Sequence, residues 1–430
     1  MLFRQFVDGD LGCGSYLVGD PDAGEAVVVD PAFAIEQYVD AAEREGVRIT
    51  RVLETHTHAD HLSGHGRFAL EHDLPTGIHP LARPEYPFDA LDDGEVLRVG
   101  SVEVRVVHTP GHRPEHCAFV LDDEVVLTGD SLFVGDAARP DLAIDAREGA
   151  ADLHRSVRRL AKLGDAVVVY PGHVSGSLCG ANMSDERSTS IGRERRTNHV
   201  LSTPLSAFVE EAASLTTPKP PTTERLVALN RGPWVGSLPP LEELPATDGL
   251  LVLDARPVDV FAAGHVPGAI SVALDGGSFA TRAAFVLDPA EPIVLHAQSQ
   301  AEAEEASRLL TAVGLFEQRG FVRGDGGERL QVLSVPEFER LRDVQVLDVR
   351  EDAERKERPL RGAIGVPYRV LRFAPPAGID PSRPVYTICA SGARATLAAS
   401  LLARQGFDAR AVVGGGVEDV LRGQRSRSTG

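Results

Sequence analysis

Seven consecutive positions, residues 55 to 61, contain three histidines and one aspartate in the order Thr-His-Thr-His-Ala-Asp-His. An unpaired imidazole is costly to bury, so a structural core has no use for so many at adjacent positions. A divalent metal, in contrast, is bound by several imidazoles and carboxylates that converge on one point. A histidine-rich solvated loop is the alternative, and the dense spacing makes it the weaker explanation. The motif therefore predicts a metal site that draws on His56, His58, Asp60 and His61.

Three later loops add side chains of the same type. His112 lies in Thr-Pro-Gly-His, Asp130 in Leu-Thr-Gly-Asp-Ser and His173 in Val-Tyr-Pro-Gly-His. A glycine precedes each of them, which allows the backbone to turn tightly and to approach an ion closely. Singly, each would be an ordinary hydrogen-bonded loop residue, but beside the cluster a ligand role is the better hypothesis. The other nine histidines show no comparable pattern and are interpreted as surface or packing residues. Among them, His116 lies only four positions beyond His112 and could reach the same pocket.

Short apolar runs precede these loops and are predicted to be the strands that position them. The runs are residues 49–53, 102–107, 118–121, 125–127 and 166–170. The alternation of strands and ligand loops extends to about Val174, and a polar, helix-capable stretch follows. Proline and glycine are then dense between residues 216 and 249, which is typical of a linker. We place the first domain boundary there.

Length and charge limit the classes of function. A chain of 430 residues is too long for one ordinary core, so we expect two or three domains. The formal net charge of −19 argues against nucleic acid or an anionic membrane as a partner, because both need a basic patch. The short arginine-rich run at residues 193–196 is predicted to be a solvated helix face.

The sequence shows neither a run long enough to span a bilayer nor the apolar core of a signal peptide, so we expect a cytoplasmic protein. The four cysteines are too few for a disulfide framework in a chain of this length. We therefore expect any functional cysteine to act as a free thiol. Cys13 and Cys117 are interpreted as packing residues.

The last part of the chain contains an internal repeat. Leu-Val-Leu-Asp-Ala-Arg, with Asp254, recurs as Val-Leu-Asp-Val-Arg, with Asp348, and a second shared segment places Ala269 and Ala363 at the same separation of 94 residues. In each copy a strand (residues 292–295 or 385–388), a turn and an amphipathic helix (residues 302–313 or 395–405) follow. This order predicts two small domains, each with a parallel α/β sheet.

The two copies differ in the loop between that strand and helix. The second copy has Cys-Ala-Ser-Gly-Ala-Arg, from Cys389 to Arg394, whose backbone amides and helix N-terminus can stabilise a thiolate or a persulfide anion. A small buried hydrophobe is the alternative for Cys389. The first copy has His-Ala-Gln-Ser-Gln-Ala from His296, without cysteine, glycine or arginine. The first copy therefore has no thiol nucleophile and a poorer anion site.

The cluster at residues 55–61, with His112, Asp130 and His173, resembles the metallo-β-lactamase fold, an αββα sandwich. Residues 128–136, Thr-Gly-Asp-Ser-Leu-Phe-Val-Gly-Asp, resemble the persulfide dioxygenase branch of that superfamily, and the repeat resembles tandem rhodanese domains. The whole chain is thus similar to persulfide dioxygenase-rhodanese fusions. The resemblance implies an α/β multidomain protein with a metallo-β-lactamase-fold domain at residues 1–240, a degenerate rhodanese-like domain at 241–328 and a rhodanese domain at 329–430.

This resemblance implies one iron, Fe(2+), held by His56, His112 and Asp130. Such a set leaves positions open for a persulfide sulfur and for O₂. The remaining candidates then orient ligands, water or substrate; they are His58, Asp60, His61 and His173. The alternative is Zn(2+) in a dinuclear hydrolase of the glyoxalase II type, in which Asp130 bridges two metals and Asp60, His61 and His173 complete the second site.

The expected activity is oxidation of a low-molecular-weight thiol persulfide by O₂ to sulfite and thiol. It is coupled to sulfur transfer at Cys389, where Arg394 stabilises the persulfide anion and sulfite or thiosulfate is the partner. Candidates for holding the polar tail of the thiol are Arg139, Asp141, Tyr170 and Ser177. A sulfur-carrier protein with a structural metal domain is a further alternative. We also expect a homo-oligomer.

Overall fold

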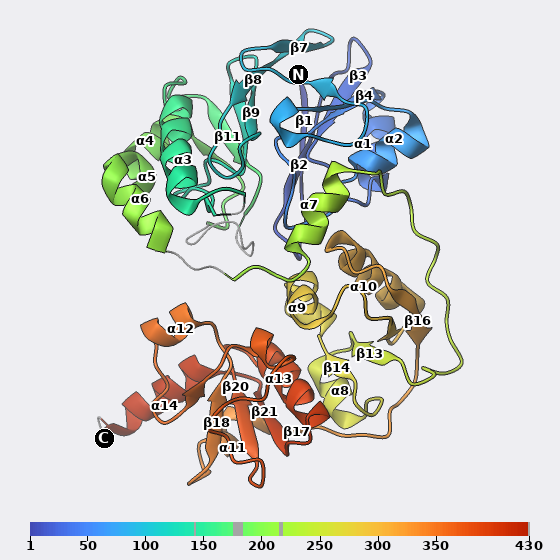
Figure 1. The fold of residues 1–430 in the computed structure, drawn as a ribbon, viewed down its shortest axis with the longest axis vertical. Helices are drawn as coiled ribbons and strands as arrows, with labels where there is room; N and C mark the ends of the chain where they lie inside the picture. Colours follow the sequence, from blue (N-terminus) through green and yellow to red (C-terminus); the bar gives the residue numbers. More distant parts are fainter. Residues whose placement is uncertain (142, 175–183, 215–217, 429–430) are drawn as a thin grey trace. The chain divides into compact units, whose positions relative to one another are not determined.

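The computed structural model describes residues 1–141, 143–174, 184–214 and 218–428 of the 430-residue chain. It divides into two compact units, of which the first comprises Met1–Leu238 with Thr311–Gly314. The second unit comprises Pro239–Leu310 and Leu315–Gly430 (Figure 1). Within the described residues, none of the helices combines the length and the apolar character that crossing a membrane requires.

Two six-stranded sheets form the centre of the first unit. The first sheet has the order β1 (Leu2–Val7), β2 (Gly14–Asp20), β3 (Glu25–Val29), β4 (Arg48–Leu53), β5 (Thr76–Ile78) and β6 (Asp89–Ala90). The second has the order β12 (Thr189–Ser190), β11 (Val168–Pro171), β10 (Val125–Gly129), β9 (Cys117–Leu121), β8 (Val102–His108) and β7 (Val96–Val99). Both sheets mix parallel and antiparallel pairs.

Side-chain alternation along the strands places one core between the sheets and one on each outer face. In β2, Tyr16 and Val18 point into the core between the sheets, whereas Leu17 belongs to the outer core. Helices α1 (Glu36–Glu45) and α2 (His65–His72) cover this outer face. The outer face of the other sheet is covered by α3 (Ala146–Leu160) and α6 (Leu205–Ser214), with α4 (Ile191–Thr197) and α5 (His199–Ser202) beside them (Figure 1).

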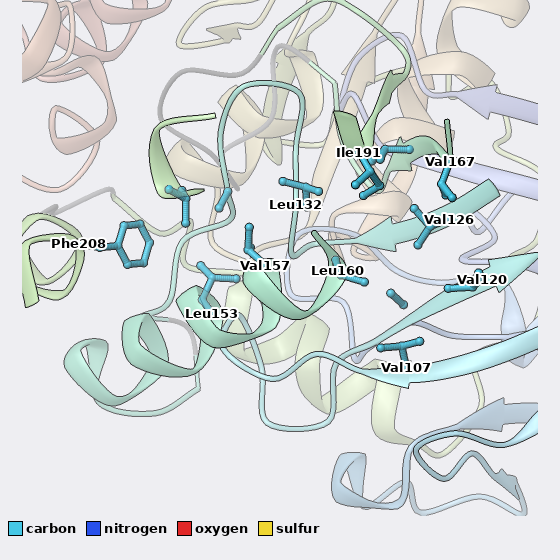
Figure 2. Packing of buried hydrophobic residues seen from close by; sticks show 14 of the residues in the cluster. Val107, Val120, Val126, Leu132, Leu153, Val157, Leu160, Val167, Ile191 and Phe208 are labelled. Atoms are coloured by element: carbon cyan, nitrogen blue, oxygen red, sulfur yellow. The ribbon is translucent and has the colours of Figure 1, made fainter. Parts of the chain in front are cut away.

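Figure 2 shows the core beneath α3, in which Leu153, Val157 and Leu160 of the helix belong to one cluster with Val120 and Val126 of the sheet. The amphipathic pattern of α3 brings apolar side chains to this face at spacings of three and four residues. The Asp145 side chain accepts hydrogen bonds from two backbone amides at the start of the helix and so caps it. The layers, in order, are helix, sheet, sheet and helix, so the predicted αββα sandwich is confirmed.

The ligand loops leave these sheets at strand ends. The cluster at residues 55–61 follows β4, and Asp130 follows β10 directly. His173 follows β11, which pairs with β10 in parallel and places Pro171 opposite Gly129. Because parallel neighbours end at the same edge, this pairing alone brings Asp130 and His173 side by side. After β12 and the four helices α3–α6, α7 (Thr223–Arg231) is the last helix before the second unit.

The second unit contains two parallel sheets, one for each copy of the repeat. The first copy has the sheet order β14 (Ile270–Ser271), β13 (Leu251–Asp254), β15 (Ile293–His296) and β16 (Gln318–Val322), with helices α8 (Val258–Ala263), η2 (Leu274–Gly276), α9 (Phe279–Val286) and α10 (Gln300–Ala312). All pairs of this sheet are parallel, as the repeat predicts.

The second copy has five strands in the order β17 (Gln331–Ser334), β21 (Ala409–Val413), β20 (Val385–Ile388), β18 (Gln345–Asp348) and β19 (Ile364–Gly365). Its helices are α11 (Val335–Phe338), α12 (Asp352–Glu357), η3 (Tyr368–Val370), α13 (Ala393–Arg404) and α14 (Val417–Ser428). Its strands also pair in parallel. Two small α/β domains with parallel sheets are thus confirmed.

Strand register aligns the two copies residue by residue. Asp254 lies opposite His296 in the first copy, and Asp348 lies opposite Ile388 in the second. The residue after each of these strands is Ala297 in one copy and Cys389 in the other. Comparison of the sequences alone set His296 against Cys389, so the structure shifts that alignment by one residue and places Ala297 at the cysteine position.

Candidate metal centre and cysteine loop

His56, His112 and Asp130 converge from three separate loops of the first unit. One ligand-type atom from each lies within 4.8 Å of the other two. Each residue is 1% exposed, so the group lies beneath the surface. The strands β8 and β10 both pair antiparallel with β9 and so end at the same edge of the second sheet, and the loop after β4 of the first sheet brings His56 to this edge. The structure thus brings together the three residues that the resemblance assigns to iron, and their role as ligands stays a prediction.

The ligand atoms that lack hydrogen-bond partners show whether this group fits a cation. Among the described residues, His56 Nε2 and Asp130 Oδ2 are buried and have no hydrogen-bond partner. His112 Nε2 lies 3.5 Å from Asp130 Oδ2. A buried polar atom without a partner is costly, whereas imidazole nitrogens and carboxylate oxygens are good donors to a divalent metal. The residues present therefore fit a metal ion.

Hydrogen bonds on the far side of each imidazole fix which nitrogen is free. The Thr55 hydroxyl donates its proton to Asp30 Oδ2 (2.9 Å) and therefore accepts from His56 Nδ1 (2.9 Å). His112 Nδ1 donates to the Arg139 carbonyl oxygen (2.9 Å). In both rings this leaves Nε2 as the lone-pair atom, which is the usual arrangement for a metal-bound histidine. Burial holds the pKa values of His56 and His112 below the ordinary histidine value, so both are neutral, as ligation requires.

His116, interpreted from the sequence as a surface or packing residue, acts directly on this group. Its Nε2 accepts a hydrogen bond from the Asp130 backbone amide (2.9 Å), and its Nδ1 contacts the Thr109 hydroxyl (2.8 Å). Burial lowers the pKa of His116 to about 3, which keeps this nitrogen an acceptor. Gly129 has a φ of +46°, and a Cβ there would lie 2.7 Å from His116 Nε2. The glycine before Asp130 is therefore required by close packing, as well as by the turn.

Asp60, His61 and His173 form a second group around a thiol that the sequence did not associate with the site. His173 Nδ1 bonds Asp130 Oδ1 (2.8 Å), and His173 Nε2 bonds Asp60 Oδ2 (2.8 Å). Cys13 Sγ lies 3.3 Å from His173 Nε2, 3.4 Å from Asp60 Oδ2 and 3.5 Å from His61 Nδ1. Cys13 is thus part of the polar site, and its interpretation as a packing residue was incomplete.

His58 faces a pair of buried carboxylates behind the cluster. Its Nε2 lies 3.0 Å from Glu54 Oε2 and 3.4 Å from Asp30 Oδ1. Burial alone lowers the pKa of His58, but the two carboxylates outweigh it and raise this pKa to about 9. Glu54 also contacts His65 Nδ1 (3.2 Å) and the Ser63 hydroxyl. A glutamate at the end of an apolar strand, directly before the histidine cluster, is a sequence signal that would have identified this group.

The residues suggested for substrate binding lie in different surroundings. The Arg139 side chain makes two hydrogen bonds to Asp141 (2.6 and 2.8 Å), next to the carbonyl oxygen that holds His112. Tyr170 packs against Phe3, with ring centres 4.6 Å apart. Ser177 lies outside the described residues. Substrate contact by any of them stays a prediction.

In the second unit, Cys389 lies between β20 and α13 and is 1% exposed. Its Sγ accepts a hydrogen bond from the Gly392 amide (3.1 Å). Gly392 has a φ of +112°, and a Cβ there would lie 3.0 Å from Val413 Cα, so the turn requires glycine. The loop thus directs a backbone N–H at the sulfur from the N-terminal end of a 12-residue helix, which favours a sulfur anion. Arg394 forms an ion pair with Glu354 (2.6 Å).

The Asp-Arg pairs of the repeat are structural in both copies. Arg350 pairs with Asp348 (2.7 Å), and Arg256 pairs with Asp254 (2.6 Å); all four side chains are buried. In the first copy, His296 Nδ1 lies 3.1 Å from Asp254, and its Nε2 donates to the Gly324 carbonyl oxygen (2.8 Å). His296 therefore cross-links the first copy internally.

Comparisons with known proteins agree with this architecture. Residues 8–173 match the model of the metallo-β-lactamase superfamily, and residues 238–326 and 334–422 each match that of the rhodanese-like domain. A protein of Mycobacterium leprae is 35% identical over 230 residues, which cover 47% of this chain and 99% of that protein. The mitochondrial persulfide dioxygenase ETHE1 of Bos taurus is 28% identical over 235 residues, 54% of this chain and 87% of that protein.

A solved structure extends the similarity into the second unit. The crystal structure of a metallo-β-lactamase from Staphylococcus aureus superposes with a TM-score of 0.69 and 26% sequence identity. The superposition covers 75% of this chain and 99% of that chain.

Proposed function

Because the chain belongs to the metallo-β-lactamase superfamily and carries two rhodanese-like domains, we propose that it oxidises a low-molecular-weight thiol persulfide with O₂ and transfers sulfane sulfur at Cys389. The observation that carries this proposal is the convergence of His56, His112 and Asp130, with His56 Nε2 and Asp130 Oδ2 left without partners among the described residues. The same chain has a cysteine loop that directs a backbone N–H at the sulfur. The similarity to a persulfide dioxygenase supports the reaction class.

In the proposed oxidation, one thiol persulfide, one O₂ and one water give one thiol, one sulfite and two protons. An iron(II) ion held by two imidazoles and one carboxylate would supply the redox chemistry and would keep positions open for substrates. The protein's part is orientation: Asp30 through Thr55 fixes the His56 ring, and the Arg139 carbonyl fixes the His112 ring. Arg139, Asp141, Tyr170 and Ser177 are our candidates for binding the thiol's polar part.

The surroundings of Cys13 bear on the choice between one metal and two. In a dinuclear zinc hydrolase, Asp60, His61 and His173 would turn their ligand atoms to a second ion. Here Asp60 and His173 hydrogen-bond to each other, and the Cys13 thiol contacts all three. A second ion at Cys13, Asp60 and His61, whose ligand atoms lie within 4.8 Å of one another, would replace these contacts. The mononuclear proposal, with His58, Asp60, His61 and His173 as orienting groups, therefore rests on the similarity to a persulfide dioxygenase.

Replacement of Cys13 tests this interpretation. In Cys13→Ala protein the thiol no longer occupies the space between Asp60 and His173, so we expect zinc content after reconstitution to rise from about one towards two ions per chain. Elemental analysis measures this ratio. Cys117→Ala is the matched control, because Cys117 is also buried but belongs to the core between the sheets. Two zinc ions in the unaltered protein would contradict the proposal.

The deciding experiment for the function is metal analysis of anaerobically purified protein combined with oxygen uptake on a thiol persulfide. We expect one iron per chain and one O₂ consumed per sulfite formed. Two equivalents of zinc with no oxygen uptake would instead establish the hydrolase.

The sulfur-transfer half of the proposal assigns nucleophile and anion stabilisation to the second copy. The Cys389 thiolate attacks a sulfane sulfur, the bond between that sulfur and its donor breaks, and the donor leaves with the electron pair. The Gly392 amide and the α13 N-terminus stabilise the resulting persulfide. We propose further that the domains span residues 1–240, 241–328 and 329–430, and that the protein is a cytoplasmic homo-oligomer.

A further inference from the structure

The Arg394 guanidinium is held on two sides by one carboxylate. Its Nη1 donates to Glu354 Oε2 (2.6 Å), and its Nη2 donates to Glu354 Oε1 (2.8 Å). Such a two-pronged pair is the strongest geometry available between these groups. Burial raises the pKa of Glu354, but the arginine outweighs it, so the net pKa lies below the ordinary value and the group is an anion at neutral pH. The pair remains open to solvent, because the side chains are 22% and 37% exposed.

Other arginines in the same neighbourhood are also engaged. Arg350 is bound to Asp348 (2.7 Å), and Arg369 is bound to Glu351 (3.0 Å). Arg282, from the first copy, donates to the carbonyl oxygens of Ala273 (3.1 Å) and Ser278 (3.2 Å) and is 5% exposed. A ligand that arrives at Cys389 therefore meets arginines that already have partners. Arg394 is the one that belongs to the Cys389 loop sequence itself, and a single exposed ion pair holds it.

The charge on the sulfur compound decides how strongly the Arg394 guanidinium stabilises it at the Cys389 site. When the Cys389 thiolate attacks thiosulfate, a sulfur–sulfur bond forms, the bond to the sulfonate breaks, and sulfite leaves with the electron pair. The thiolate and the thiosulfate dianion together place three negative charges in one site. The reverse reaction, in which sulfite takes sulfur from the Cys389 persulfide, passes through the same transition state. A thiol persulfide carries at most one negative charge at its reacting end, so it needs a neighbouring cation less.

We propose that Glu354 determines the specificity of the Cys389 site, because its carboxylate competes with dianionic sulfur compounds, such as thiosulfate and sulfite, for the Arg394 guanidinium. The inference rests on the proposed sulfur-transfer function and deepens it. Glu354 lowers the affinity for dianions and leaves thiol persulfides little affected. A site that exchanges sulfur between a thiol persulfide and sulfite then releases the dianionic product easily.

The internal repeat supports a role that is special to the cysteine-bearing copy. The separation of 94 residues that relates Asp254 to Asp348 sets Val260 opposite Glu354. Arg394 is the second residue of α13, and the second residue of α10 in the other copy is Ala301. The copy without a cysteine thus has neither the guanidinium nor its partner, whereas it retains the Asp254–Arg256 pair that holds the fold.

Glu354→Gln in the full-length chain tests the proposal. Glutamine keeps an oxygen to accept the Glu351 backbone N–H, which Glu354 does in the native helix cap (3.0 Å), but it removes the charge that holds Arg394. We expect KM for thiosulfate and for sulfite to fall roughly tenfold, a change equivalent to loss of one competing charge-assisted contact. The kcat with these compounds and the KM for a thiol persulfide should stay within about twofold.

Two comparisons separate competition from a structural role. Glu337→Gln removes a carboxylate with the same capping function in α11, where it accepts from the Ser334 amide (2.8 Å), and should change none of these constants. In an Arg394→Gln background, Glu354→Gln should have no further effect on KM for dianions. A rise in KM for thiosulfate, or an equal change for the thiol persulfide, would overturn the proposal.

A binding measurement keeps this test independent of turnover. Sulfite does not react with the resting thiol, so calorimetry on the wild-type and Glu354→Gln proteins compares affinity alone, and we expect binding about tenfold tighter in the variant. Absence of sulfur transfer from every donor would refute the proposed function of Cys389. Equal sulfite affinity in the two proteins would refute the role of Glu354.

Discussion

His112→Ala protein is expected to be purified without its metal and to lose persulfide-dependent oxygen uptake by at least about a thousandfold. His112 contributes one of only three donors in the group, and its ring is fixed in advance by the Arg139 carbonyl. Without it, His56 Nε2 and Asp130 Oδ2 are left as two buried donors, which are too few to retain a divalent ion against solvent. Elemental analysis and an oxygen electrode measure the two losses.

The histidine four positions earlier provides a matched control for this variant. His108 ends strand β8, stacks on His79 and contacts the Pro114 carbonyl oxygen (2.8 Å), so it lies close to His112 in sequence but takes no part in the ligand group. His108→Ala should keep the metal and the oxygen uptake. Sulfur transfer at Cys389 should be unchanged in both His112→Ala and His108→Ala. Full oxygen uptake by metal-free His112→Ala protein would remove the basis for the proposed oxidation.

Cys389→Ser protein should lose sulfur transfer instead of oxygen uptake. We expect its sulfurtransferase activity to fall by roughly ten thousandfold or more. A serine hydroxyl is a far weaker nucleophile than a thiolate and does not form a persulfide, although it fits the loop and still meets the Gly392 amide. Oxygen uptake with a free thiol persulfide should be retained, because those reactants do not require Cys389. Mass spectrometry of the protein after exposure to a sulfur donor detects the added sulfur atom.

Cys117→Ala serves as the cysteine control here, since Cys117 is buried in the core between the sheets. The pair of variants also decides between the proposed enzyme and a sulfur carrier. If Cys389→Ser removed oxygen uptake as well, and His112→Ala merely lowered the melting temperature, the first domain would be structural and the chain would be a carrier.

Much of the local chemistry was visible in the sequence. The His-x-His-x-Asp-His spacing and the glycines before His112, Asp130 and His173 identified the loops, and the 94-residue repeat identified two related parallel α/β domains. These signals are short-range, because a ligand loop, a tight turn or a strand-turn-helix unit is specified by residues within a few positions of each other.

The tertiary structure supplied what depends on long-range contact. Cys13 lies 160 positions before His173, yet its thiol meets that ring, and nothing in its own neighbourhood indicates this. His116 appeared unpatterned because its partner is a backbone amide at Asp130. The strand register, and not residue similarity, showed that Ala297 takes the place of Cys389.

The sequence by itself thus determined the donor atoms and the reactive thiol of this protein, together with the turns on which they lie. Only the tertiary structure decided which donors are free and which are engaged. His56 Nε2 and Asp130 Oδ2 remain unshared, whereas Asp60 and His173 are bound to each other and Arg394 is bound to Glu354. The physical reason is that a side chain's chemistry is set by its residue type, but its available lone pairs and charge are set by whichever partners the fold brings within hydrogen-bonding distance.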